Sequence, residues 1–228
     1  MKSYNFELIS CDTDAITICK QDMGTFNKEE IFKLTKELNS LFPDGIGWEF
    51  EFNAPVMIVL KAKNYLVVDE KGKWKIKGSA LKSSTLEPAL KDMIHKMLKA
   101  LVDDRQEELS VIYLEMIRNI RDRNIDIKQW AKKMQLSPTT FNSTRSNETK
   151  VVDAIKGTDY KSGDRIYVYP AEGDILRLLE HFNNDYDQDK FYKKVFKATE
   201  RFASILPVKE MFVNYSLKRN KQALTELT

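Results

Sequence analysis

Two carboxylates separated by one residue are the strongest chemical feature of the sequence. Asp12-Thr13-Asp14 lies between two β-rich stretches, residues 4–10 and 15–19, so it is predicted to form the tip of a hairpin. Side chains two positions apart in a strand point the same way. Two carboxylates on one face suit a hard cation such as Mg²⁺, which takes one or two carboxylates together with substrate phosphates. The pattern therefore favours metal-assisted chemistry at this tip.

Three residues alone leave other interpretations open. Asp is common in turns because it tolerates turn geometry, so the same residues can serve structure only. A DxD site of the glycosyltransferase type, which binds a metal and a nucleotide sugar, is a second chemical alternative. The elements that carry the tip, and the residues that follow it, have to decide between these interpretations.

The composition excludes several classes of protein and favours a polyanion partner. The chain has 228 residues, of which 42% are apolar and 31% charged, as expected of a soluble folded protein. No apolar run is long enough for a membrane span, and the N-terminus lacks the apolar stretch of a signal peptide. The two cysteines, Cys11 and Cys19, are too few for a disulfide framework. A cytoplasmic location is therefore expected. Residues 61–82 carry seven Lys against two acids, and residues 190–221 carry nine Lys or Arg against two acids. Such basic stretches suit a polyanion, although solvated Lys-rich faces are the simpler alternative.

The periodicity of the chain predicts an α+β fold with a boundary near residue 82. The first part, 1–82, contains the hairpin, a helix over 28–41 capped by Asn27, and antiparallel strands. The second part, 83–228, is mostly helical and begins with Ser84 and Glu87 at capping-box spacing. The predicted strands are 48–52, 56–68, 73–77 and Arg165–Tyr169; the predicted helices include stretches over 90–101, 109–120 and around 126–135, with helices filling most of 172–204 and a polar stretch over 137–149.

A resemblance to a known family decides between the interpretations of the hairpin. SCDTDAI (10–16) resembles motif C of family B DNA polymerases, written YxDTDS. The segment EFNAPVMIVLKAKNY (51–65) is similar to the strand of that family that runs into its KKRY motif, which stands here as Ala62-Lys63-Asn64-Tyr65. These matches occur in the family's order and extend over nearly the whole chain. KIKG (75–78) with KSST (82–85) resembles the palm-to-thumb junction of tailed-phage replicative polymerases, and AIKG (154–157) with GDRIYVYP (163–170) resembles their thumb.

The resemblance implies that 1–82 is the C-terminal part of a palm domain and 83–228 a thumb. Asp14 would be a principal ligand of two catalytic Mg²⁺ ions, with Mn²⁺ as a substitute, and Asp12 and the backbone of Thr13 would assist it. The implied reaction is attack of a primer 3′-oxygen on the α-phosphate of a dNTP. Lys63 and Tyr65 match the positions that contact the minor-groove side of the primer–template end.

Further DNA contacts are expected at the junction and in the thumb. Hydroxyls, amides and cations there can bind phosphates and sugars, although helix capping and an ordinary polar loop are the alternatives. The candidates are Lys77, Lys82, Ser83 and Ser84 at the junction, and Asn142, Thr144, Arg145, Asn147, Lys150 and Lys156 in the thumb.

The sequence departs from the family pattern in two ways. Ser10, Ala15, Ala62 and Asn64 replace the tyrosine, serine, first lysine and arginine of the two motifs, which softens the expected DNA contacts. In addition, no DxxSLYPS-type motif A, no KxxxNS-type motif B and no exonuclease are found. The chain is therefore expected to be inactive alone and to need an N-terminal polymerase chain that carries these parts, which describes either a natural split or a fragment. An obligate seam through the palm is expected between the two.

The expected partners are primer–template DNA, dNTP and that second chain, in the cytoplasm of a phage-infected bacterial host. A sliding clamp is kept as a candidate partner, although LKRNKQALTELT at the C-terminus lacks a clear clamp-binding pattern of paired aromatics. A non-catalytic DNA-binding or regulatory thumb is the alternative of a different class.

Overall fold

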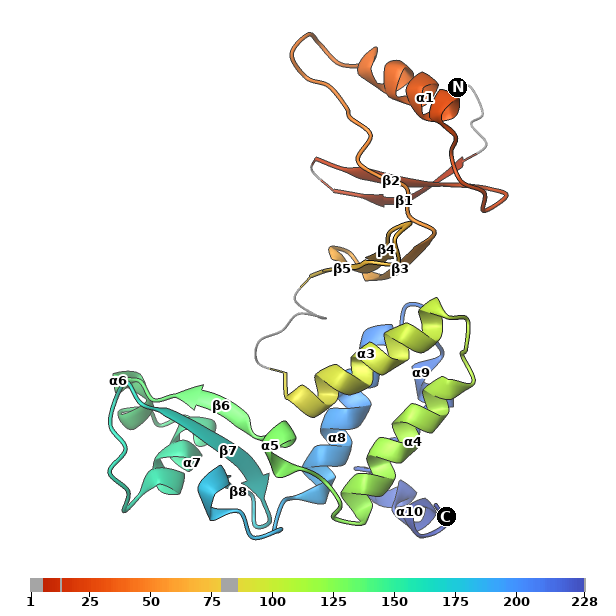
Figure 1. The fold of residues 1–228 in the computed structure, drawn as a ribbon. Coiled ribbons are helices and arrows are strands. Elements are labelled where there is room, and N and C mark those ends of the chain that lie inside the picture. The colour runs from red at the N-terminus through yellow and green to blue at the C-terminus, as the bar shows by residue number, and fades with distance from the viewer. Residues whose placement is uncertain (1–5, 13, 79–85, 228) are drawn as a thin grey trace. The chain divides into compact units, whose positions relative to one another are not determined.

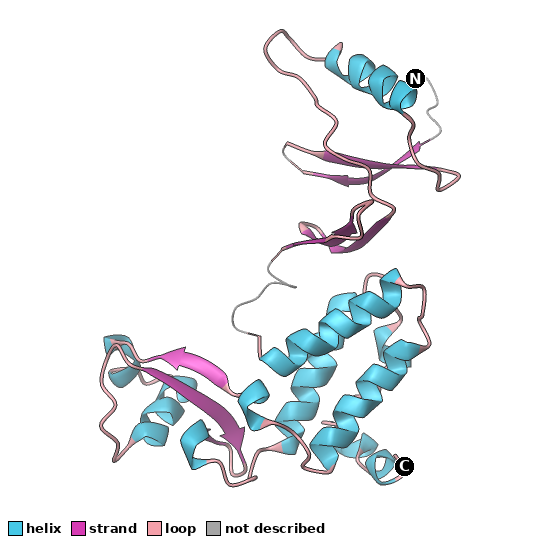
Figure 2. Cartoon of the chain, viewed as in Figure 1, coloured by secondary structure: helices cyan, strands magenta, loops and turns pink. Residues whose placement is uncertain are grey.

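The chain forms two compact units, Met1–Lys82 and Ser83–Thr228, each of which mixes helices with antiparallel sheet (Figures 1 and 2). The computed structural model describes residues 6–12, 14–78 and 86–227. The α+β fold class predicted from the sequence is confirmed. The palm and thumb assignments of the units stay predictions.

Unit 1 begins with the predicted hairpin. Its strands β1 (Phe6–Cys11) and β2 (Ile16–Lys20) pair antiparallel, with a bulge between Leu8 and Ser10. Helix α1 (Lys28–Asn39) follows, and Asn27 and Glu30 form a capping box at its start. Because this box accepts hydrogen bonds from backbone N–H groups that would otherwise lack a partner in the first turn, the helix starts where the sequence predicts.

A second small sheet completes unit 1. The strands β3 (Val56–Lys61), β4 (Asn64–Val68) and β5 (Trp74–Lys77) form it in that order. Its buried apolar side chains are Leu60, Leu66, Val67 and Val68. The stretch predicted as one strand over 56–68 is a hairpin with a two-residue turn at 62–63. The strand predicted over 48–52 is wrong, because 46–54 is irregular in the structure. A strand needs a neighbouring strand to complete its backbone hydrogen bonds. The described strands of unit 1 pair only with one another, and none of them pairs with residues 48–52.

The centre of unit 2 is a helical bundle of α3 (Pro88–Val102), α4 (Glu108–Arg121) and α8 (Gln188–Thr199). The apolar faces predicted for the first two helices are buried, as Met93, Met97 and Leu109 show. Aromatic rings close the bundle at one end, where Phe191 stacks between Trp130 and Tyr186 at centroid distances of 4.7 and 5.0 Å.

The predicted capping box at the start of α3 is wrong. The helix begins at Pro88 with Glu87 as its N-cap residue, and the Glu87 side chain makes no capping hydrogen bond. Pro is favoured at the first helical position because it has no N–H to leave unsatisfied. The Glu87 carboxylate instead binds the Nζ of Lys194 on α8 at 2.5 Å. Ser84 lies outside the described residues.

The rest of unit 2 is a smaller lobe built on a sheet. One prediction is wrong here, because the helix predicted around 126–135 ends at Trp130 and a strand follows it. Helices fill most of 172–204 as predicted, although a strand lies within this range, and the polar stretch 137–149 contains helices that the sequence did not predict. Local periodicity does not reveal β6, because its partner β7 lies 30 residues further along the chain. Strand β8 also pairs with β7, but it follows β7 directly as a hairpin. The elements of this lobe are α5 (Ile127–Trp130), β6 (Lys132–Gln135), α6 (Pro138–Phe141), α7 (Ser146–Ile155), β7 (Arg165–Ala171), β8 (Ile175–Leu178) and η1 (Leu179–His181).

Short helices follow α8 in the last part of the chain. They are η2 (Glu200–Phe202), α9 (Val208–Met211), η3 (Lys218–Asn220) and α10 (Gln222–Thr225). None of the helices in the described ranges is long and apolar enough to span a membrane. Tyr113 of α4 fastens this region, because its hydroxyl donates to the carbonyl oxygen of Val213 at 2.6 Å.

Candidate active site

The two predicted carboxylates lie in the turn between β1 and β2. The backbone N–H of Asp12 donates to the carbonyl oxygen of Ala15 at 2.8 Å, which closes the turn. Asp12 and Asp14 are both exposed, whereas Thr13 lies outside the described residues. Both carboxylates are therefore accessible to a ligand that approaches the tip of the hairpin.

A lysine from the second sheet reaches one of these carboxylates. The Nζ of Lys63 lies 3.4 Å from Oδ1 of Asp12, and the two side chains are 75% and 44% exposed. An ion pair this exposed contributes at most about 1 kcal/mol to stability. Its importance is positional, because it joins residues of two separate sequence motifs that lie in the turns of different sheets.

The other two candidates of unit 1 lie beside Lys63. Tyr65 on β4 is half-buried and stands opposite Lys77 on β5, which is exposed. Lys63 occupies the turn that leads into the same strand β4. The structure thus brings Lys63, Tyr65 and Lys77 to one end of this sheet, while Lys82, Ser83 and Ser84 lie outside the described residues.

The donor set of the hairpin fits part of a magnesium site. Carboxylate oxygens are the ligands that a hard cation prefers. Among the described residues, however, no group of three or more His, Cys, Asp or Glu side chains is placed to hold a metal ion. Asp12 and Asp14 can therefore contribute ligands, and the other ligands have to come from substrate phosphates, water or groups outside these residues.

The predicted thumb contacts are only partly available to a ligand. Asn142, Thr144, Arg145 and Lys156 are exposed around α7, and Asn147 belongs to that helix, although its side chain is outside what the structure describes.

Lys150 differs, because its Nζ binds Asp174 at 2.5 Å. Hydrogen bonds from Lys150 and Lys190 hold the pKa of Asp174 well below its usual range, at about 2. A phosphate at Lys150 would have to compete with this carboxylate.

Sequence reasoning missed one cationic surface of unit 2. Across the β6–β7 pair, Lys133 stands opposite Tyr167 and Gln135 opposite Arg165, and all four are exposed. The opposite face carries Ile166 and belongs to the core of the lobe. We call Lys133, Gln135, Arg165 and Tyr167 the polar sheet face. The alternation of Arg165 and Tyr167 with apolar residues was a usable signal, but Lys133 was assigned to a helix.

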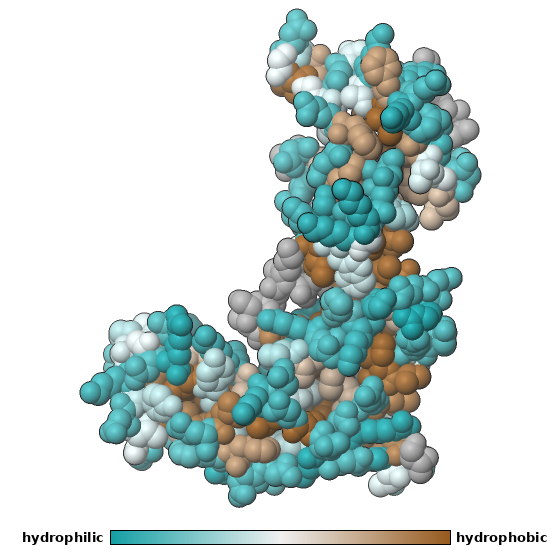
Figure 3. Space-filling view, in the orientation of Figure 1, coloured by the Kyte–Doolittle hydropathy of each residue, from teal (hydrophilic) through white to brown (hydrophobic). Residues whose placement is uncertain are grey.

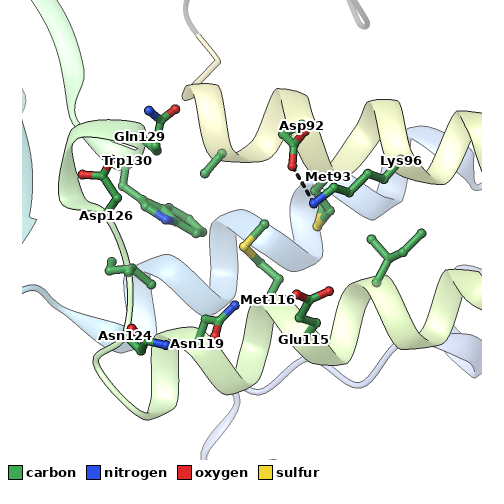
Figure 4. Close-up of a pocket in the computed structure, with 13 residues that line it drawn as sticks. Asp92, Met93, Lys96, Glu115, Met116, Asn119, Asn124, Asp126, Gln129 and Trp130 are labelled. Atoms are coloured by element: carbon green, nitrogen blue, oxygen red, sulfur yellow. Dashed lines mark ion pairs between the residues drawn. The ribbon is translucent and has the colours of Figure 1, made fainter.

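A cavity of about 330 Å³ lies in unit 2, and none of the candidate residues lines it (Figure 4). Met93, Met116 and Trp130 contribute apolar surface to it. The polar groups at its rim already serve the fold, since Asp92 binds Lys96 at 2.9 Å and Asp126 caps α5. This cavity is therefore not part of the candidate site.

Comparison with known proteins identifies the family. The model of DNA polymerase family B matches residues 1–211 of the 228. The chain belongs to DNA polymerase family B. A search of curated proteins gave no match.

A solved structure shares the fold of this family B chain. It is the family B DNA polymerase from the hyperthermophilic archaeon Pyrobaculum calidifontis, with a TM-score of 0.68 and 16% sequence identity. The match covers 90% of this chain and 27% of the archaeal one. This family B chain therefore spans about a quarter of the length of the polymerase that it matches.

Proposed function

We propose that this chain is the C-terminal palm and thumb portion of a DNA-directed DNA polymerase. Unit 1 is the palm part, with the Asp12–Asp14 turn as its catalytic tip, and unit 2 is the thumb that grips duplex DNA. The observation that carries the proposal is the approach of Lys63 to Asp12, since it joins the motif C turn and the KKRY-like turn of a family B chain at one place.

The proposed chemistry is nucleotidyl transfer assisted by two Mg²⁺ ions, with Mn²⁺ as a substitute. Asp14, with help from Asp12 and the backbone of Thr13, would hold the ions, which polarise the phosphate and favour attack by the primer 3′-oxygen. Lys63 and Tyr65 position the primer end. An ammonium donor can bind the acceptors that every base pair presents in the minor groove, so such a contact is independent of sequence.

The surface of unit 1 supports a need for further parts of a polymerase. Helix α1 buries none of its side chains, and Phe32 and Leu8 are 71% and 61% exposed. Apolar side chains interrupt the polar surface in Figure 3. A two-stranded sheet with an uncovered apolar surface is marginal by itself. We therefore propose that motif A and the fingers, together with an exonuclease domain, lie on a partner polymerase chain or elsewhere in a longer polymerase, and that this part packs on the β1–β2 hairpin and α1.

In unit 2 we propose that duplex DNA contacts the polar sheet face together with the exposed residues around α7. Lys133 and Arg165 can bind phosphates, and Gln135 and Tyr167 can donate hydrogen bonds to phosphate or sugar oxygens. These contacts would position the duplex without reading its sequence.

A titration of labelled primer–template DNA at several salt concentrations tests this function. Phosphate contacts make log K fall linearly with log salt, with a slope of about −0.9 for each phosphate neutralised. The proposal expects binding with such a slope, and the same for unrelated sequences. Binding of a nucleotide sugar with indifference to DNA would instead support a DxD glycosyltransferase. DNA binding by a complex that never extends a primer would support a non-catalytic thumb.

A further inference from the structure

The turn that presents Lys63 is held by an unusual neighbour. Lys63 has a φ of 60°, in the left-handed region that L-residues with a Cβ rarely adopt. The next residue, Asn64, is only 6% exposed, and its Nδ2 donates to the carbonyl oxygen of Ala62 at 2.9 Å. The buried side chain of Asn64 therefore crosses the turn and binds Ala62, the first residue of that turn.

Gly78 completes this arrangement from the adjacent strand. It follows β5 and has a φ of 94°. A Cβ at this position would collide with the side-chain amide of Asn64 and with the carbonyl oxygen of Lys63. Glycine thus allows the backbone after β5 to lie directly against the turn. Any side chain at this position would be too large for such a close approach.

Left-handed backbone is unfavourable at a residue with a Cβ such as Lys63, so the surroundings must impose it. Contacts that can impose it include the hydrogen bond from Asn64 to Ala62 and the close approach of Gly78. Both act on the turn and neither involves the Lys63 side chain, which leaves its Nζ available to approach Asp12.

We propose that Asn64 is a positioning residue, which together with Gly78 fixes the left-handed turn that presents Lys63 toward Asp12 and the DNA. This inference rests on the proposed function of Lys63. It also reassigns a departure from the family pattern: where the motif has an arginine, the buried amide of Asn64 supports the turn from inside and makes no contact with DNA itself.

A double-mutant cycle on DNA binding tests the inference. Asn64→Ala and the isosteric Asn64→Asp, which lacks the amide donor, are each combined with Lys63→Ala, and affinity for primer–template is measured by fluorescence anisotropy. We expect each Asn64 variant to lower affinity about 5-fold to 10-fold when Lys63 is present and less than 2-fold when it is alanine, since coupled residues are not additive. Gly78→Ala should show the same coupling. Asn53→Ala, at another partly buried asparagine of unit 1, is the control and should not couple.

A second readout needs no DNA. The NMR order parameter of the Lys63 backbone amide should fall from about 0.85 toward 0.6 in Asn64→Asp, while that of Val67 stays unchanged. Equal losses of affinity in both Lys63 backgrounds, or an unchanged order parameter, would overturn the inference. If the unmodified chain binds no DNA, the proposed function fails instead, and the order parameter still decides whether Asn64 holds the turn.

Discussion

The ammonium of Lys63 lies 3.4 Å from a carboxylate oxygen of Asp12, although the two residues lie in turns of different sheets of unit 1. A cation in this place offsets part of the negative charge at the tip of the hairpin. In the proposed function, a metal ion at Asp12 would therefore compete with Lys63, and DNA bound to Lys63 would release Asp12 from the ion pair. The two ligands expected at this site are linked through one ion pair.

Replacement of Lys63 by alanine is expected to weaken binding of primer–template DNA about 5-fold to 30-fold. The reason is the loss of a charge-assisted hydrogen bond, which typically contributes about 1.5–3 kcal/mol when buried by a ligand and less when it stays exposed. The control is Lys71→Ala in the β4–β5 turn, which removes the same charge from the same sheet. Equal losses in the two variants would show that only net charge matters and would remove the special role of Lys63.

The elements that the sequence predicted correctly are those with local causes. The apolar face of α3 and the Asn27 cap of α1 are visible within one or two helical turns. Strand β6 was missed because it depends on pairing with the distant β7, and the strand predicted over 48–52 lacks any pairing. Strand β8 was missed although it forms a local hairpin with β7.

The candidate site shows the same division between local and distant causes. Asp12, Asp14 and Lys63 were found from their motifs, but the approach of Lys63 to Asp12 depends on two sheets and needed coordinates. The burial of Asn64 could not be predicted from the sequence either, since comparison with the KKRY motif shows only that an asparagine replaces the arginine. The polar sheet face required the register of β6 against β7.

The ion cluster at Asp174 makes an acid-dependent contribution to the stability of unit 2. The folded-state pKa is about 2, against 3.8 for an unperturbed Asp. Because the pKa is lowered on folding, the contribution is complete above pH 4 to 5 and is lost as the pH falls through 2. Asp174→Asn should lower the stability at pH 6, and the difference from the unmodified chain should shrink between pH 4 and pH 2. A difference that stays constant down to pH 2, measured by urea unfolding, would contradict this assignment.

The buried carboxylate of Glu87 depends on a lysine from another helix. Its side chain is 9% exposed and binds Lys194, which is 30% exposed. Lys194→Met keeps the length of the side chain but removes the ammonium group that this carboxylate binds, while Arg201 still acts on Glu87 electrostatically. The lost charge-assisted hydrogen bond should lower the free energy of unfolding by about 1–3 kcal/mol. Lys193→Met is the matched control, because Lys193 is exposed on the same helix. Chemical denaturation of both variants checks the prediction, and equal stabilities would refute it.

The polar sheet face should reveal phosphate contacts through salt dependence. Arg165→Ala is expected to weaken binding of all duplex sequences by a similar factor and to reduce the slope of log K against log salt by about 1. Arg105→Ala offers a comparison in unit 2, because Arg105 binds Asp103 and Glu108 and lies in a different lobe. An unchanged slope in Arg165→Ala would contradict the proposal that DNA contacts the polar sheet face.

Primer extension tests the central claim most directly. The chain is purified with its partners from its native source, and extension with Mg²⁺ is compared among the unmodified chain, Asp14→Asn and the control Asp44→Asn at another exposed Asp. Groups outside a metal's ligand shell typically contribute 10-fold to 100-fold, so removal of a ligand should cost at least about 100-fold. The account predicts such a loss for Asp14→Asn and none for Asp44→Asn. Undiminished extension by Asp14→Asn would contradict the assignment of the hairpin as the catalytic tip.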